Sequence, residues 1–321
     1  IASSILFPPA CVRTFASTIK KMAECGINLI AFTPPDLLDA CEKHGVKAIL
    51  FDERITPRWD LPYDAEKGNK VLREIIELYN DHPAVYGNQL PELGKSSRLV
   101  NELAPGKWAY VNLPPGLGDW YDTTYVQMFV DYCAPKFISY DNYAIGESDP
   151  YGFSWGYWAN IWDIRSASLR NNIPFHTILL TAAHFSYRAP SFNDLALQIY
   201  GALAYGAQGF GYYKLVGETL HLTEAPELGN WHGAPLDEFH EVNPIPYYNL
   251  RKMNKRIQNM APILLRLKSE DVYHIGGDSI PQRNHGIRET SLIQGMEAGV
   301  SFIIGEFTHI EDHSTWLMIV N

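Results

Sequence analysis

Short apolar runs alternate along this chain with segments whose apolar residues recur at helical spacing. Most runs are continuously apolar, which is typical of parallel strands covered on both faces. Gly26 and Gly45 come just after two helical segments, where a left-handed residue ends a helix favourably. The predicted strands are residues 4–7, 27–32, 46–51, 84–92, 108–113, 137–141, 175–180 and 209–213. The predicted helices include residues 14–25, 36–44, 69–80 and 247–259.

Eight strands with intervening helices over about 260 residues match the usual size of a (β/α)8 barrel. The pattern therefore predicts an α/β protein with a TIM barrel over residues 1–262. A doubly wound open sheet is the alternative. No Gly-x-Gly-x-x-Gly follows the first strand, so a dinucleotide-binding fold has little support and we expect no cofactor.

The pattern changes after residue 259, where strand-like runs are separated by Gly, Asn and acidic turns. We expect residues 263–321 to form a small β-rich, sandwich-like C-terminal module. Its last run reaches Asn321 in mid-strand, so we expect either a longer natural chain or a module that closes onto the barrel. The predicted strands are residues 272–275, 291–293, 300–307 and 316–321.

Composition narrows the possible partners. The formal net charge is −10, the pI is near 5.5, and the 26 Lys and Arg are scattered, which argues against nucleic-acid and anionic-membrane partners. No stretch approaches the roughly 18 apolar residues of a membrane-spanning helix, and no pattern specifies an oligomeric state. The 8 Trp and 19 Tyr fit the aromatic surfaces of carbohydrate sites, and they fit a core equally well.

The four cysteines, Cys11, Cys25, Cys41 and Cys133, occur singly, without Cys-x-x-Cys spacing or clustered His. This argues against a metal site and favours buried free thiols. The alternative is one disulfide in a secreted protein, for which Cys25 and Cys41 are the expected pair. The chain begins at Ile1 rather than Met, so we expect a removed leader, or a trimmed chain, and a secreted or periplasmic protein.

Barrel active sites collect at the carboxyl ends of the strands, so polar residues that end each run are the candidates. Glu92 and Asp141 are the expected catalytic pair, because two carboxylates, one protonated and one ionised, are the minimal machinery for glycosidic hydrolysis. Asp52 and Glu53 also end a run. The expected substrate-binding residues are Gln89, Asn112, Tyr140, Asn142, Tyr143, Trp155, Trp158, His184, Tyr213, Lys214 and Glu218.

Aromatic rings stack on the CH-rich faces of sugars, and amides satisfy hydroxyl groups, which is why Trp155, Trp158 and Tyr143 are candidates. Each candidate also has a structural interpretation. Glu92 could be a surface loop acid, Asp141 a loop cap, and the two tryptophans packing residues beneath a long loop. His184 fits a sugar-binding role and a satisfied loop histidine equally, and Lys214 would suit an anionic substrate.

Residues 137–143, 164–175 and 203–209 resemble those of bacterial clan A glycoside hydrolase barrels related to family 42 β-galactosidases. The resemblance covers most of the chain and implies a barrel that acts on carbohydrates. Two departures stand out. Pro91-Glu92-Leu93 replaces the family's Asp-Glu-Pro, and residues 180–185 lack the nucleophilic Glu that clan A places at the end of strand seven. The second carboxylate is then Asp141 or Glu218, or hydrolysis has been lost.

Three functions follow from these residues. The leading hypothesis is a glycoside hydrolase that cleaves a polysaccharide or oligosaccharide, with Glu92 as general acid and Asp141 as nucleophile or base. Its rival is a carbohydrate-binding pseudoenzyme on the same barrel, which the missing strand-seven acid favours. A third is a lyase or isomerase that uses His184 and Tyr143.

Overall fold

The computed structural model describes residues 2–3, 16–55, 64–89, 94–115, 124–143, 145–146, 155–219, 230–276, 279–295, 297 and 299–321. The helices of these residues are α1 (Ala16–Glu24), α2 (Leu38–Lys43), α3 (Ala65–Tyr79), α4 (Lys95–Leu103), α5 (Tyr125–Cys133), α6 (Trp155–Asn171), α7 (Phe192–Ala204) and α8 (Pro244–Leu264), with 3-10 turns at Pro35–Leu37 and Glu53–Ile55. Within this described part of the chain, no helix is long and apolar enough to cross a membrane.

The strands of the first part of the chain form two parallel sheets. One has the order β1-β2-β3-β4-β5 and the other β6-β7-β8-β9, and β10 pairs with β11 in a small antiparallel ribbon. The bounds are β1 (Ala2–Ser3), β2 (Leu29–Thr33), β3 (Lys47–Leu50), β4 (Val85–Gln89), β5 (Trp108–Tyr110), β6 (Asn112–Leu113), β7 (Ile138–Asp141), β8 (Phe175–Leu180), β9 (Gly209–Tyr213), β10 (Glu218–Thr219) and β11 (Asn230–Trp231).

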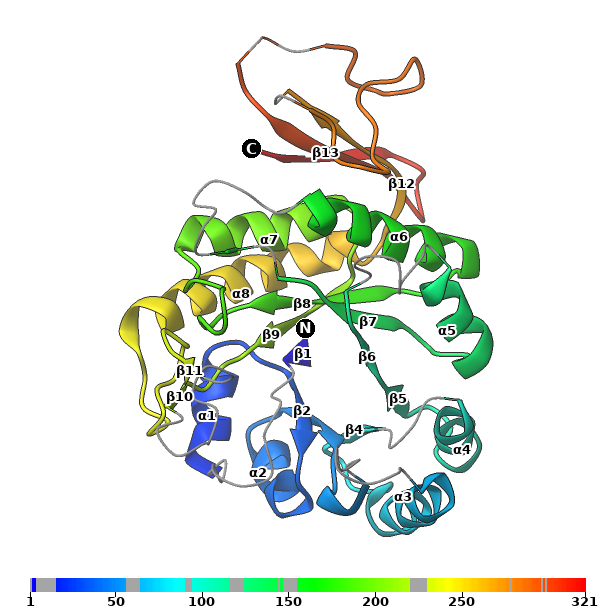
Figure 1. Ribbon diagram of the computed structural model, residues 1–321, viewed down its shortest axis with the longest axis vertical. Coiled ribbons are helices and arrows are strands. Elements are labelled where there is room, and N and C mark those ends of the chain that lie inside the picture. The colour runs from blue at the N-terminus through cyan, green and yellow to red at the C-terminus, as the bar shows by residue number, and fades with distance from the viewer. Residues whose placement is uncertain are drawn as a thin grey trace.

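The two sheets follow one another around a common centre (Figure 1). Only Val111 separates β5 from β6, and β1 lies against β9. The helices cover the outside of the strands (Figure 1). This arrangement confirms the predicted α/β protein with parallel strands, and it fits a TIM barrel. The predicted first strand, residues 4–7, lies outside the described residues.

Side chains along each strand point alternately to the inside and the outside of the sheets, which gives two apolar layers. The inner face carries a small cluster of Leu29, Ala31, Ile49, Tyr110 and Phe137, whereas the outer face joins the helices in the large core. Gly87 belongs to the inner face, because it pairs with Ile49 of that face, and a Cβ atom there would overlap the carbonyl oxygen of Trp108. The interior is thus packed with side chains, which leaves the carboxyl ends of the strands as the place where polar groups gather.

Local signals in the sequence explain several helix ends. Gly26 and Gly45 have φ values of +88° and +68°, which confirms the predicted left-handed ends of the first two helices. At α3 the Asp64 side chain accepts a hydrogen bond from the Lys67 amide, and at α7 Ser191 and Asp194 form a capping box.

The C-terminal part is an antiparallel sheet of three strands, β12 (Leu267–Ile275), β13 (Phe302–His309) and β14 (Thr315–Val320). It packs on the outside of α7 (Figure 1), and it is compatible with the predicted β-rich module. The predicted strand at residues 291–293 is wrong, since this segment is irregular. The amide of Leu292 donates to the Glu306 carboxylate and that of Ile293 to the Tyr273 hydroxyl, so side chains take the place of a strand partner.

Cys25, Cys41 and Cys133 are buried free thiols, which confirms the expectation for these three and excludes a Cys25–Cys41 disulfide. Burial raises the pKa of Cys25 and of Cys41 to about 12, so both stay protonated and unreactive. Cys11 lies outside the described residues.

Candidate carbohydrate site

Asp141 ends β7 on the inner face of the sheets. The register of β6 and β7 pairs Asn112 with Ser139, so the Asn112 amide lies one step from the Asp141 carboxylate and donates a hydrogen bond to it. The Ser139 hydroxyl donates to the side-chain oxygen Oδ1 of Asn112 at 2.9 Å and fixes the orientation of that amide. Burial raises the pKa of Asp141 to about 6, and the Asn112 hydrogen bond opposes the rise. This carboxyl group therefore changes its protonation state near neutral pH.

The Asp141 charge acts on three tyrosines. Burial and then the Asp141 charge hold the pKa values of Tyr143 and Tyr187 above their usual range. The pKa of Tyr213 is raised by burial first and then by the charges of Glu218 and Asp141. The rings of Tyr143 and Tyr213 stack with centroids 5.8 Å apart. All three hydroxyl groups stay protonated and can donate hydrogen bonds to a ligand.

His184, 3% exposed, is the centre of an aromatic cluster after β8. Its ring lies 5.5 Å from Tyr143, 5.1 Å from Tyr213 and 6.0 Å from Trp231, between centroids. Its Nδ1 donates to the carbonyl oxygen of Ala182 at 3.0 Å, since a carbonyl can only accept. Burial lowers the pKa of His184, and Lys214 adds to the effect. The imidazole is thus neutral at physiological pH, with Nε2 as an acceptor.

Lys214 and Glu218 form a buried ion pair beyond β9, with side chains that are 1% and 4% exposed. The Lys214 ammonium also lies 4.3 Å from the ring centroid of Trp231, which pairs with Glu218 across the β10–β11 ribbon. Burial lowers the pKa of Lys214, and the Glu218 carboxylate opposes this change. The two charges neutralise each other, so Lys214 supports Glu218 rather than offering a charge to an anionic substrate.

Seven of the predicted site residues thus come together at the carboxyl ends of β6, β7, β8 and β9: Asn112, Asp141, Tyr143, His184, Tyr213, Lys214 and Glu218. Glu92 lies outside the described residues, as do the side chains of Gln89 and Trp155. Asp52 binds Arg54, which holds the pKa of its carboxyl group below the usual range.

The structure places three predicted residues elsewhere. Tyr140 is fully buried in the core between the strands and the helices, because residues on either side of Asp141 along the strand point outward. The Asn142 amide donates to Asn160 of α6. Trp158 lies on α6 rather than in a loop and stacks on Tyr205, with centroids 5.7 Å apart, beside His274 of the C-terminal module. The expectation that these three line the site is corrected.

Sequence reasoning missed Tyr187, Trp231 and Phe185, which join the His184 cluster. Phe185 and Tyr187 follow His184 by one and three residues. A search for site residues that continues three positions past His184 therefore finds both. Trp231 lies in a Gly- and Asn-containing segment far from any predicted strand. Its position depends on the pairing of β10 with β11 and on a bridge between Ala183 and His232.

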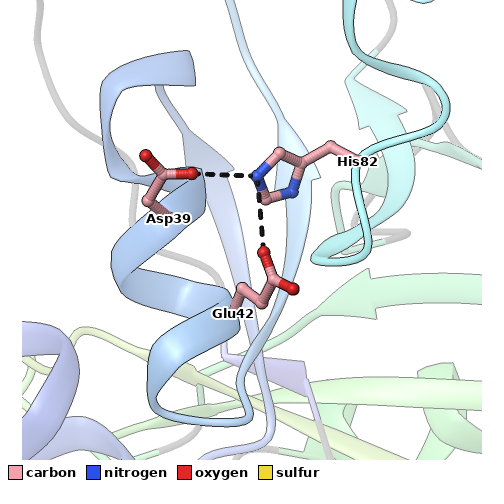
Figure 2. A group of neighbouring side chains, drawn as sticks. All are labelled: Asp39, Glu42 and His82. Atoms are coloured by element: carbon pink, nitrogen blue, oxygen red, sulfur yellow. Dashed lines mark hydrogen bonds and ion pairs between the residues drawn. The ribbon is translucent and has the colours of Figure 1, made fainter.

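Within the described residues, Asp39, Glu42 and His82 are close enough together to hold a metal ion (Figure 2). They lie at the amino end of β4, away from the site above. The amide of Ala84 donates to Nδ1 of His82 at 3.1 Å, so the neutral ring carries its proton on Nε2 and donates it to Asp39 at 3.2 Å. That nitrogen has no lone pair for a metal. We therefore interpret this group as a surface hydrogen-bond cluster.

The sequence matches no protein-family model and no curated protein. Among solved structures, a β-galactosidase from the psychrophilic Marinomonas ef1 is similar with a TM-score of 0.60 and 12% identity, over 82% of this chain and 60% of that one. A putative α-L-fucosidase from Bacteroides thetaiotaomicron is similar with a TM-score of 0.56 and 10% identity, over 79% of this chain and 94% of that one. A Lactobacillus rhamnosus β-glucuronidase is similar with a TM-score of 0.53 and 12% identity, over 75% of this chain and 46% of that one. At these identities the likeness establishes that the chain shares the fold of glycoside hydrolases.

Proposed function

We propose that the two sheets close into one (β/α)8 barrel over residues 1–262, with a separate β-rich module over residues 263–321. The continuous passage from β5 to β6 and the contact of β1 with β9 support closure, because each leaves no free sheet edge between the two sheets. Helix α8 ends at Leu264 and β12 begins at Leu267, which supports a boundary near residue 262.

We propose that this barrel is a glycoside hydrolase acting on an oligosaccharide or polysaccharide. The observation that carries the proposal is the Asp141 carboxyl group, whose pKa burial raises to about 6 at the carboxyl end of β7. A carboxyl group with a raised pKa is the usual proton donor of a glycosidase. Phenol donors and the Asn112 amide around it suit sugar hydroxyls. Shared fold with a β-galactosidase and a β-glucuronidase adds support.

The raised pKa of Asp141 favours a change in the assignment of roles. As a nucleophile Asp141 would have to be ionised, whereas below about pH 6 it holds a proton that it can deliver to the leaving oxygen. The second carboxylate of the proposal is Glu92 or Glu218. Glu218 is paired with Lys214 and almost wholly enclosed, which favours electrostatic support over direct attack. Glu92 then remains the proposed partner, as the sequence predicts.

Three variants test these roles on one hydrolysed oligosaccharide. If Asp141 donates the proton, Asp141→Asn should lower kcat/KM by about 10² to 10⁴. The wild-type kcat/KM should fall as pH rises through about 6, because the acid form is lost. Glu92→Gln should be at least as damaging and Glu218→Gln milder. Full activity of Asp141→Asn contradicts the proposal, and an inactive Glu218→Gln with an active Glu92→Gln moves the second role to Glu218.

A carbohydrate-binding protein without hydrolysis is the second candidate. Residues 181–184, which follow β8, are Thr, Ala, Ala and His, so no carboxylate stands there. The neutral His184 is packed within aromatic rings and offers only a hydrogen-bond acceptor. Binding of a glycan without new reducing ends would favour this second function.

A further inference from the structure

Phe185 presents an aromatic ring to solvent beside the His184 cluster. It comes five residues after the end of β8, is 56% exposed, and has a φ of +50°. A non-glycine residue in this left-handed region costs of order 1 kcal/mol or more, and such strain persists only where the surrounding structure imposes it. Two bridges impose it here, one between His184 and Tyr187 and one between Ala183 and His232. The chain thus holds a large apolar ring in water at an energetic cost.

Two neighbouring aromatic rings contact the ring of Phe185. Its ring meets His184 at 5.3 Å and Trp231 at 6.4 Å between centroids, both in edge contacts. Trp231 is already packed, since Lys214 lies over its ring and His184 stacks on it. His184 is enclosed as well. Of these three rings, Phe185 is the most exposed and offers the largest surface to a ligand, whereas Trp231 is half-buried.

The position of Phe185 relative to Asp141 sets the size of the ligand. Tyr143 follows Asp141 by two residues, and two ring contacts of 5.5 and 5.3 Å between centroids lead from Tyr143 through His184 to Phe185. Phe185 is thus two ring contacts away from Tyr143, and we expect the next sugar of a chain to reach it. The charge of Lys214, which lies over the Trp231 ring, is neutralised by Glu218. The Phe185 ring therefore offers its face without a positive charge for an anionic sugar.

We propose that Phe185 is the stacking platform of a second sugar-binding subsite, which takes an uncharged pyranose ring next to the sugar held at Asp141. The apolar CH face of the pyranose packs on the negative face of the aromatic ring. This inference rests on the proposed function, because it assumes that the cluster binds sugars. It goes beyond that function in making the protein selective for chains of two or more sugars.

The test compares Phe185→Ala, Phe185→Leu and Phe185→Trp with the wild type. Tyr248→Ala is the matched control, since Tyr248 is also a 56% exposed aromatic residue but lies on α8. The probes are matched mono-, di- and trisaccharides of galactose, glucose, fucose and glucuronic acid, used for both binding and reducing-end release. Circular dichroism and thermal melting report whether each variant folds.

We expect the wild type to prefer di- and trisaccharides of the uncharged sugars to the monosaccharide. Phe185→Ala and Phe185→Leu should lose about 3- to 10-fold of that preference, whereas Phe185→Trp and Tyr248→Ala should retain it. Wild-type binding of chains with an unchanged preference in folded Phe185→Ala overturns the subsite and leaves the proposed function standing. A preference for glucuronic acid chains also overturns it. Absence of any sugar binding or hydrolysis by the wild type overturns both proposals.

Discussion

Replacement of Asp141 by Asn should stabilise the folded protein at neutral pH. The carboxyl group ionises near 3.8 in the unfolded chain and at about 6 in the folded protein, because burial penalises its charge. Between these two pH values the folded protein binds more protons than the unfolded chain, so the free energy of unfolding falls as pH rises. The amide of Asn at this position carries no charge and is free of that penalty. Its oxygen can still accept the hydrogen bond of Asn112.

The pKa difference sets the size of the effect. Each pKa unit corresponds to about 1.4 kcal/mol, so a rise from 3.8 to about 6 costs the ionised wild type about 3 kcal/mol. Near pH 4.5 most of the cost is absent, because the folded protein is protonated there. Asp141→Asn should therefore exceed the wild type by only about 1 kcal/mol near pH 4.5 and by up to about 3 kcal/mol near pH 8.

Urea unfolding followed by tryptophan fluorescence measures this difference at both pH values. Asp81→Asn is the control, because Asp81 is exposed and its charge is solvated. It should change the free energy of unfolding little at either pH. The reasoning is refuted if Asp141→Asn is less stable than the wild type near pH 8, or if the two differ by the same amount at both pH values.

Three further changes test other parts of the structure. Glu218→Gln leaves the Lys214 ammonium buried without its partner and should lower the free energy of unfolding by about 3–5 kcal/mol. The double variant Lys214→Met, Glu218→Leu should lower it less, and equal losses of the two variants in urea unfolding would contradict the buried ion pair. Gly87→Ala should cost about 1–3 kcal/mol through overlap inside the sheets, while Gly295→Ala, with open space around it, should be neutral by the same assay. Zinc should give no calorimetric binding signal that His82→Ala removes, because His82 Nε2 carries a proton; such a signal would overturn the tautomer assigned here.

The sequence predicts well what depends on local patterns. Continuous apolar runs place the strands of both parallel sheets, and glycines such as Gly26 and Gly45 place the helix ends. The register of the parallel strands β6 and β7 pairs Asn112 with Ser139, two residues before Asp141 on the same face, which brings Asn112 and Asp141 together. These outcomes follow from chain periodicity and strand direction alone.

Other features depend on contacts between distant segments. Trp158 belongs to a helix that the C-terminal module covers, and only the docking of that module on α6 and α7 decides that its ring is enclosed. Side chains of β7 point alternately inward and outward, and because Asp141 points inward, Tyr140 points outward. An apolar run in the sequence does not decide which of the two sets of side chains points inward. The contact of Trp231 with His184 and Lys214 needs a long connection to return to β9.

Reducing-end release from a broad panel of neutral and acidic glycans, by wild type and by Asp141→Asn in parallel, tests the central claim most directly. The account predicts new reducing ends from at least one glycan with the wild type, fastest below about pH 6, where Asp141 holds its proton. It also predicts a loss of about 10² to 10⁴ in rate for folded Asp141→Asn. No product from any glycan, or equal rates for the two proteins, would contradict the claim that Asp141 belongs to the catalytic pair of a glycoside hydrolase.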